Sequence, residues 1–515
     1  MATNRSEAST PTDPRPARRV GPERPAPEAH ERKLKFAVIG AGMAGILSVI
    51  ELRGAGYDDI TVYEKADSFG GTWRENTYPG LACDVPSHLY SYSFAPNPDW
   101  THTFSEGGEI RAYFERVARE HDLARHVRFG DEVVACRFVD GRWEIETASG
   151  HRDIADVVIA ATGVLHHPNI PEIAGIDSFT GATFHSARWD HSVALDGERI
   201  GVIGTGSTAV QITAALVDRA SHFRLFQRTA QWVLPQANNA YSEEERARFA
   251  SDPELLRTMH DNLAEAFGAF ATAVIDADSQ GMAMIERLCR ENLDTVADPE
   301  LRERLRPSYR AGCKRLVVSP DFYAAIQAPH AELVDVAIEG VEPNGVRTVD
   351  GVLHELDVLV LATGFHADAF MRPMAVTGRD GVTLAARWSP RPNAYLSISM
   401  PDVPNFFMVN GPNGPVGNFS LIEVAERQLG YILQLVALLR DGRAREIAPT
   451  TQAMEDHEAA RVAAAKDSIW VTGCRSWYLD DRGIPATWPW TFDRFRQAMA
   501  APNLDCFELV GAQPD

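Results

Sequence analysis

Closely spaced pairs of cysteines are missing from this sequence. Its six cysteines are Cys83, Cys136, Cys289, Cys313, Cys474 and Cys506, and no two of them are spaced as C-x-x-C. This pattern predicts neither a metal site nor a disulfide framework, and it favours a reducing, cytoplasmic location.

Basic side chains and long apolar runs are also scarce. Lysine and arginine number 50 against 71 aspartates and glutamates, which gives a formal net charge of −21. This acidic balance argues against nucleic acid, or an anionic membrane surface, as the main partner. No apolar run approaches the roughly 18 residues of a membrane span, so we expect no membrane association.

The first part of the chain has the composition of a tail. Residues 1–33 are rich in proline, arginine, glutamate and alanine, and they lack the apolar stretch that a signal peptide needs. We expect a disordered tail here, with a short partner-binding arm as the alternative. The chain of 515 residues is long enough for two or three domains, each with its own core.

A glycine-rich turn follows the tail. Residues 34–64 predict a unit of strand, turn, helix and strand, with Gly40, Gly42 and Gly45 forming the pattern G-x-G-x-x-G at the turn. Such glycines let the backbone approach a pyrophosphate at the helix N-terminus. Glu64 ends the second strand, where its carboxylate can accept hydrogen bonds from ribose hydroxyls. The unit therefore predicts a dinucleotide site.

The same unit occurs a second time, over residues 199–226. Its turn contains Gly204, Gly206, Ser207, Thr208 and Ala209. The strand that follows leads into Arg228 and Thr229 and carries no acidic residue at its end. An arginine there can bind a 2′-phosphate that a carboxylate would repel, which favours NADPH over NADH. The alternative is that Arg228 is a solvated surface arginine.

Two buried strands that end in Thr-Gly, at residues 162–163 and 363–364, would serve as crossovers between two dinucleotide domains. We therefore expect an α/β fold with two Rossmann-like domains. Its predicted parts are a first domain over 34–163, a second over 164–360 with a helical insertion at about 242–310, and a return to the first domain over 361–515.

Residues 70–84 follow the first unit and combine glycines, aromatics and an acid. Gly70 and Gly71 let the backbone approach a planar ring, and Trp73 and Tyr78 offer aromatic walls. Thr72, between Gly71 and Trp73, is a further candidate for cofactor binding. Asp84 closes this stretch as a candidate functional carboxylate. Its alternative role is that of a turn or helix-capping aspartate, because Pro86 and Ser87 follow.

From about Lys33 onward the chain resembles the flavin-dependent Baeyer–Villiger monooxygenases, a branch of the class B flavoprotein monooxygenases. Residues 70–84 match one long fingerprint of this family at every fixed position. Phe179, Gly181, His185 and Trp189 match the second, F-x-G-x-x-x-H-x-x-x-W.

The resemblance implies FAD at the first glycine turn and NADPH at the second. NADPH would reduce FAD, dioxygen would add at flavin C4a, and the resulting peroxide would convert a small-molecule ketone to an ester or lactone. The ketone is not defined by the sequence, and the oligomeric state stays open between a monomer and a homodimer.

The family also has a Lys-Arg pair, matched here by Lys314 and Arg315. The resemblance places Arg315 over the flavin, Asp84 beside it, and Lys314 on the 2′-phosphate. Arg315 would be a permanent positive charge beside the developing oxyanion, because arginine does not lose its proton in proteins. Without the resemblance, a solvated basic pair would be the preferred interpretation.

Three aromatic residues near the C-terminus, and two residues of the second fingerprint, are further candidates for the site. Trp477 and Tyr478 match a tract that approaches the nicotinamide or substrate in relatives, and Phe419 is a candidate pocket residue. For Trp477 and Tyr478 the alternative is that they are core aromatics. His185 and Trp189 would couple domain rotation to catalysis, or form a buried structural pair.

Three other functions are alternatives for a chain with these motifs. A flavin monooxygenase that oxygenates sulfur or nitrogen is the nearest alternative. A disulfide reductase would need a reactive cysteine pair at the flavin, and Cys83 has no close partner in the sequence. A non-catalytic flavin sensor is disfavoured by the intact Lys314–Arg315 pair.

Overall fold

The computed structural model describes residues 32–389, 391–415, 419–466, 468–474, 476 and 479–511. Most of the predicted tail therefore lies outside the described residues. Arg32, which we had placed in the tail, is bonded to the folded body. Its backbone N–H donates to the carbonyl oxygen of Arg440 at 2.8 Å, and its guanidinium pairs with Asp156 at 2.9 Å.

The first glycine turn belongs to a five-stranded parallel sheet. The strand order is β19 (Phe406–Met408), β7 (Val157–Ala160), β1 (Phe36–Ile39), β2 (Ile60–Glu64) and β3 (Val127–Phe129). The predicted helix is α1 (Met43–Gly54), which packs against α11 (Leu421–Arg440). All four residues of β1 are buried, as a parallel strand covered on both faces requires.

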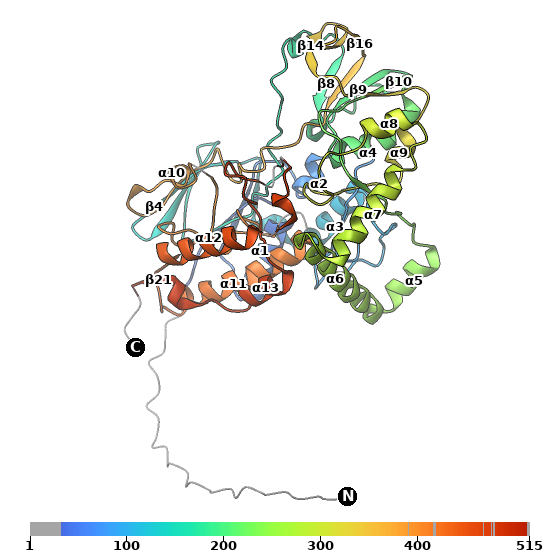
Figure 1. Cartoon of the computed structure of the whole chain (residues 1–515). Helices are drawn as coiled ribbons and strands as arrows, with labels where there is room; N and C mark the ends of the chain where they lie inside the picture. Colours follow the sequence, from blue (N-terminus) through green and yellow to red (C-terminus); the bar gives the residue numbers. More distant parts are fainter. Residues whose placement is uncertain are drawn as a thin grey trace, which may run out of the picture.

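The second glycine turn belongs to a second five-stranded parallel sheet. Its order is β13 (Ala331–Val334), β10 (His222–Phe226), β9 (Arg199–Ile203), β17 (Val358–Leu361) and β8 (Ala182–His185). The helix after its turn is α4 (Ser207–Leu216). Figure 1 shows strands β8, β9 and β10 at the upper right, away from α1 and α11–α13.

Two crossing segments connect the sheets. The chain leaves the first sheet after β7 and the second after β17, in each case through Thr-Gly. The two segments run antiparallel: the N–H of Asn169 donates to the carbonyl oxygen of Gly364, and that of His366 donates to the carbonyl oxygen of His167, both at 2.9 Å. The sheets are therefore joined by a paired connection rather than by two independent linkers.

Four helices lie between the short paired strands β11 (Val233–Leu234) and β12 (Val317–Val318). They are α5 (Glu243–Ser251), α6 (Pro253–Ile275), α7 (Gln280–Leu293) and α8 (Pro299–Arg304). The start of α5 follows from sequence, because Ser242 and Glu245 form a reciprocal capping box. Pairing of β11 with β12 returns the chain to the point where it left.

Smaller elements complete the molecule. Antiparallel strands extend the first unit at β4 (Val133–Val139), β5 (Arg142–Thr147) and β6 (Arg152–Ala155), with β18 (Ala375–Thr377) parallel to β4. The remaining larger helices are α2 (Thr72–Glu75), α3 (Gly107–Glu120), α9 (Phe322–Ala325), α10 (Leu384–Arg387), α12 (Thr451–Ala465) and α13 (Phe492–Ala498). The second unit carries a small sheet of β14 (Ile338–Glu342), β15 (Gly345–Thr348) and β16 (Leu353–Glu355), and β20 (Glu446–Pro449) pairs with β21 (Phe507–Val510).

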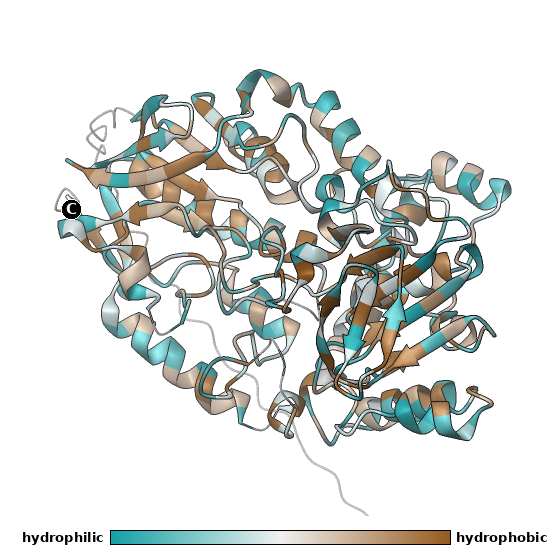
Figure 2. Ribbon diagram, turned by 90° about the horizontal axis from the view of Figure 1, so that it is seen from above, coloured by the Kyte–Doolittle hydropathy of each residue, from teal (hydrophilic) through white to brown (hydrophobic). Residues whose placement is uncertain are grey.

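Apolar residues gather in the sheets. Figure 2 shows brown ribbon along the strands and teal along the helices at the rim of the molecule. The two faces of each parallel sheet lie in different buried clusters. One face of the first sheet includes Phe36 and Val38, and one face of the second includes Ile200 and Val202. Within the described ranges, no helix combines the length and apolarity needed to cross a membrane.

Candidate functional site

The first glycine turn brings backbone to a helix N-terminus. Gly40 has a φ of +104°, and a Cβ on it would lie 2.6 Å from the carbonyl oxygen of Ala161. Only glycine adopts this conformation without strain. Glu64 is buried beside the turn and accepts a hydrogen bond of 2.7 Å from the N–H of Ala41. The predicted carboxylate therefore lies at the glycine turn.

The segment after this unit folds back onto it. A Cβ on Gly71 would lie 3.0 Å from the Cα of Gly42, so two glycine backbones from separate segments meet here. Gly71 precedes α2, and Thr72 is the first residue of that helix. The indole N–H of Trp73 donates to the hydroxyl of Tyr90 at 3.1 Å. Close backbone approach of this kind fits the cradle of an extended cofactor.

The second glycine turn repeats the first. Gly204 has a φ of +125°, and a Cβ on it would lie 2.2 Å from the carbonyl oxygen of Ala362. Gly206 is exposed, and a Cβ there would meet no described heavy atom within 4 Å. Ser207 begins α4, with Thr208 in its first turn. The Thr205 hydroxyl donates to the carbonyl oxygen of Thr229 at 2.7 Å, which ties the turn to the segment after β10.

Two cations that the sequence separates lie near one another. Arg228 is exposed just after β10, and the Lys314 ammonium lies 4.7 Å from the ring centre of Tyr309. Burial, together with the positive charge of Arg228, lowers the pKa of Lys314. Because like charges repel, this arrangement favours an anion between them.

The central pair of the predicted site is formed. The guanidinium of Arg315 donates a hydrogen bond to the carboxylate of Asp84 and forms an ion pair with it. Asp84 follows α2, whereas Arg315 stands between α8 and β12, 231 residues further along the chain. Their side chains are 28% and 34% exposed, so the pair remains open to a ligand.

We had expected Tyr78 to form an aromatic wall beside the glycine cradle, but it does not. It is buried in the apolar cluster of the second unit, and its hydroxyl donates to the side-chain oxygen of Gln211 in α4 at 2.8 Å. The amide of Gln211 in turn donates to the carbonyl oxygen of Ala82 at 3.0 Å. Burial raises the pKa of Tyr78 to about 12. The 70–84 segment thus also forms the interface between the two units.

Gln211 was not foreseen from the sequence. It lies on a helix that follows a glycine turn, and nothing in its local pattern marks it as a contact to residues more than a hundred positions away. A contact at that separation leaves no local signal.

The second fingerprint lies at the edge of the second sheet. A Cβ on Gly181 would lie 2.3 Å from the carbonyl oxygen of Asp357 and would also meet the Phe179 ring. His185 is buried at the end of β8, and its Nε2 lies 3.0 Å from the carbonyl oxygen of Gly364 in the second crossing segment. Burial lowers the pKa of His185. Trp189 is buried and packs edge-on against Phe184.

The C-terminal candidates have different outcomes. Trp477 and Tyr478 lie outside the described residues. Phe419 is 5% exposed, and its ring stacks on that of Phe492 at 4.7 Å. It packs in the apolar core of the first unit.

Similarity to known proteins agrees with this geometry. The flavin-binding monooxygenase-like family matches residues 33–248. An uncharacterized monooxygenase of Mycobacterium tuberculosis is 49% identical over 92% of this chain and 95% of its own. A Baeyer–Villiger monooxygenase of Streptomyces coelicolor is 38% identical over 95% of this chain and 94% of its own.

The chain belongs to the Baeyer–Villiger monooxygenases.

Solved structures of such enzymes share the whole fold. Cyclohexanone monooxygenase from Rhodococcus, bound to NADP+, superposes with a TM-score of 0.82 at 31% identity, covering 93% of this chain and 99% of its own. OTEMO in complex with FAD and NADP gives a TM-score of 0.84 at 26% identity, with the same two coverages. The predicted fold, with two Rossmann-type domains, and the predicted activity, NADPH-dependent Baeyer–Villiger oxidation by a flavoprotein, are confirmed.

A disulfide in this monooxygenase corrects one expectation. Cys313 and Cys474 are bonded to each other, across 161 residues of sequence. Spacing rules find cysteines that are close in sequence, so a pair brought together only by the fold escapes them. Cys83, beside Asp84, is a free and buried thiol.

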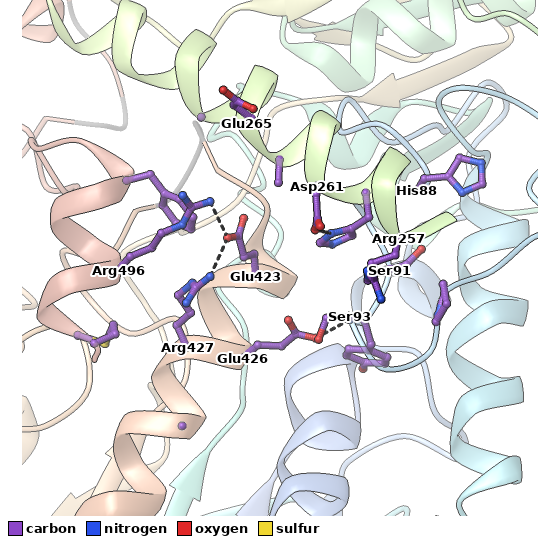
Figure 3. A pocket seen from close by; sticks show the side chains of 18 of the residues that line it. His88, Ser91, Ser93, Arg257, Asp261, Glu265, Glu423, Glu426, Arg427 and Arg496 are labelled. Atoms are coloured by element: carbon purple, nitrogen blue, oxygen red, sulfur yellow. Dashed lines mark hydrogen bonds and ion pairs between the residues drawn. The ribbon is translucent and has the colours of Figure 1, made fainter. Parts of the chain in front are cut away.

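The monooxygenase also has a large charged groove. It measures about 1470 Å³ and opens between α6, α11, α13 and the loop at residues 88–96. Figure 3 shows Arg427 and Arg496 both reaching Glu423, while Glu426 accepts from the N–H of Ser93 at 2.7 Å. None of the predicted site residues lines this groove. Its charged walls do not suit an apolar ketone, because taking charged side chains out of water is costly.

Proposed function

We propose that the two glycine turns divide the cofactors of this Baeyer–Villiger monooxygenase between two domains. Residues 34–163 and 361–515 would bind FAD, with its pyrophosphate at the N-terminus of α1. Residues 164–360 would bind NADPH, with its pyrophosphate at the N-terminus of α4. Both N-termini begin after glycines in close backbone contact with a neighbouring strand end, which leaves room for an extended phosphate.

We further propose that Arg228 and Lys314 select NADPH. Burial lowers the pKa of Lys314, the positive charge of Arg228 lowers it further, and Arg228 is exposed beside the second turn. A 2′-phosphate between them would satisfy both cations. Thr229, bonded to Thr205 through its carbonyl oxygen, would hold the strand end beside the ribose.

The Asp84–Arg315 pair is the observation that carries the catalytic proposal. FAD, when bound, supplies the chemistry that activates dioxygen. Arg315 supplies a charge that no ordinary pH removes, and it would stabilise negative charge on the reacting oxygen atoms. Asp84 fixes the direction of the guanidinium through its ion pair. The substrate of this site is a ketone, and the product is the corresponding ester or lactone.

Replacing Arg315 tests this role. Arg315→Ala should leave the reduction of bound FAD by NADPH intact, because hydride transfer does not need the oxyanion charge. Ester formation should fall by at least about 100-fold, the usual loss when one oxyanion-stabilising group is removed. Rapid-mixing absorbance measures the first step, and gas chromatography of the product measures the second.

Arg315→Lys is the matched control, because it keeps the charge but loses the planar fork. It should recover part of the ester yield. An Arg315→Ala enzyme with the normal yield of ester would remove the proposed role.

A further inference from the structure

The Cys313–Cys474 disulfide joins the loop that carries Lys314 and Arg315 to a C-terminal segment. Cys313 directly precedes Lys314 and Arg315, and Cys474 stands three positions before Trp477 in the sequence. Cys313 is fully buried and Cys474 is 8% exposed. The bond therefore connects the loop of the proposed oxyanion charge to the C-terminal part of the chain.

Apolar packing brings these segments together. Ala311 and Leu316 flank the Lys314–Arg315 loop, and both lie in one buried cluster with Ile469 and Trp470 from the C-terminal segment. The Sγ of Cys313 lies 3.7 Å from the carbonyl oxygen of Trp470. Apolar packing thus brings the two cysteines close enough to bond.

The packing between the two segments is incomplete. A cavity of about 430 Å³ opens at their junction, lined by Tyr309 and Ala311 from one side and by Thr472 from the other. Side chains that line an open pocket have packing partners on one side only, so apolar contacts hold this edge of the junction less firmly than a filled core would. Cys313 lies two positions after Ala311 and Cys474 two positions after Thr472, so the covalent bond crosses the junction beside this pocket.

We propose that the Cys313–Cys474 disulfide is a redox-sensitive tether that positions Arg315 for oxygen transfer. The proposal rests on the role of Arg315 given above. With the bond formed, the loop stays fixed to the C-terminal segment and the guanidinium stays directed by Asp84. With the bond reduced, the loop moves relative to its support. A larger share of the NADPH consumed then yields hydrogen peroxide instead of ester.

The redox step balances with reagents of known class. Reaction of NADPH, a proton and dioxygen without oxygen transfer gives NADP+ and hydrogen peroxide. One thiolate attacks a peroxide oxygen, the O–O bond breaks, and a sulfenic acid forms with loss of hydroxide, which takes up the thiol proton as water. The second thiol attacks that sulfur and releases a second water, leaving the disulfide. A small dithiol reverses the step and is itself oxidised to its disulfide.

Thiol counting tests whether the tether exists in solution. The holoenzyme, denatured without reductant, should release four titratable thiols, because Cys83, Cys136, Cys289 and Cys506 are free. After reduction all six cysteines should react. Peptide mapping should find Cys313 and Cys474 in one cross-linked species. The proposal would be overturned if six thiols react before reduction while the same sample converts all of its consumed NADPH to ester without forming hydrogen peroxide.

The functional test measures hydrogen peroxide formed per NADPH consumed, with a ketone present. Cys474→Ser should raise this ratio at least threefold, with FAD content and melting temperature recorded alongside. Wild-type enzyme treated with dithiothreitol should show the same rise, and reoxidation by hydrogen peroxide should reverse it. Dithiothreitol should have no effect on Cys474→Ser. Cys506→Ser, which removes a thiol but not the bond, should behave as wild type.

The outcomes separate the two proposals. An unchanged peroxide ratio in reduced wild-type enzyme would overturn the tether, even if Cys474→Ser proves too unstable to purify. A normal ester yield from Arg315→Ala would overturn the role of Arg315 itself. A third outcome is that Arg315→Ala makes no ester while reduced wild-type enzyme forms no additional hydrogen peroxide per NADPH. That outcome would support the role of Arg315 and overturn the tether.

Discussion

At the scale of single residues, Lys314 and Arg315 are adjacent in the sequence, but their side chains make different contacts. Arg315 reaches Asp84, while Lys314 lies over Tyr309 and feels the charge of Arg228. An arginine keeps its charge at any pH an enzyme meets, whereas a lysine with a lowered pKa does not. The pair therefore combines one permanent cation and one that titrates.

The titration of Lys314 predicts a pH dependence. Its pKa is lowered from the ordinary value for lysine, so it loses its proton at a lower pH than an exposed lysine would. As pH rises through this lowered pKa, kcat/KM for NADPH should fall relative to that for NADH. The ratio reports the free enzyme, in which no phosphate raises the pKa again.

Lys314→Arg provides the comparison for this profile. It keeps the charge at high pH, so its preference for NADPH should stay level over the same range. A wild-type preference that does not change up to the pH where ordinary lysines titrate would contradict the assignment of Lys314.

Arg228 allows a test at fixed pH. Arg228→Ala should raise KM for NADPH by about 10- to 100-fold, the range expected when a hydrogen bond between charged groups is lost. KM for NADH should change little, because NADH carries no 2′-phosphate. Equal losses for both cofactors would show that Arg228 does not contact the phosphate.

At the scale of elements, the two dinucleotide units share a way of beginning their helices. Gly42 precedes α1 and Gly206 precedes α4, and glycine has no side chain to cap a helix. The first N–H groups of both helices are thus left for an anion. In contrast, α5 satisfies its own first turn through Ser242 and Glu245. Helices α1 and α4 therefore begin without a side-chain cap, as the proposed pyrophosphate sites require.

The first unit makes a prediction about its third glycine. In Gly45→Ala the new Cβ would lie 1.9 Å from the carbonyl oxygen of Gly40, so the turn must shift. Purified protein should then carry less than half of the FAD of wild type, measured by flavin absorbance per chain. Gly54→Ala, at the end of the same helix, meets no described heavy atom within 4 Å and should keep its FAD. Full FAD content in Gly45→Ala would contradict the proposed pyrophosphate position.

Much at this scale was predictable from sequence, because glycine turns and apolar strands are local signals. The helix Met43–Gly54 follows the first glycine turn, and the strand Ile60–Glu64 ends at Glu64, both as predicted. Tyr78 was misplaced, since its aromatic character fits a ligand wall and an interface equally well. The meeting of Asp84 with Arg315 was foreseen only through resemblance to a family, as residues 231 positions apart share no local pattern.

At the scale of the whole molecule, the two units are joined in several ways. Paired crossing segments connect the sheets, and the 70–84 segment reaches from the first unit to Gln211 in the second. The disulfide closes a third connection, between the insertion side and the C-terminal segment. The spacing of Thr-Gly segments in the sequence pointed to the first of these connections, whereas the other two arise only on folding.

The central claim is that this chain transfers one atom of dioxygen to a ketone. The most direct measurement supplies heavy-isotope dioxygen and NADPH with a panel of cyclic and open-chain ketones, and follows the products by mass spectrometry. We expect an ester or lactone that carries one heavy oxygen atom for each NADPH consumed in coupled turnover. Oxidation of a thioether or amine while every ketone is returned unchanged, or hydrogen peroxide as the sole product, would contradict the account.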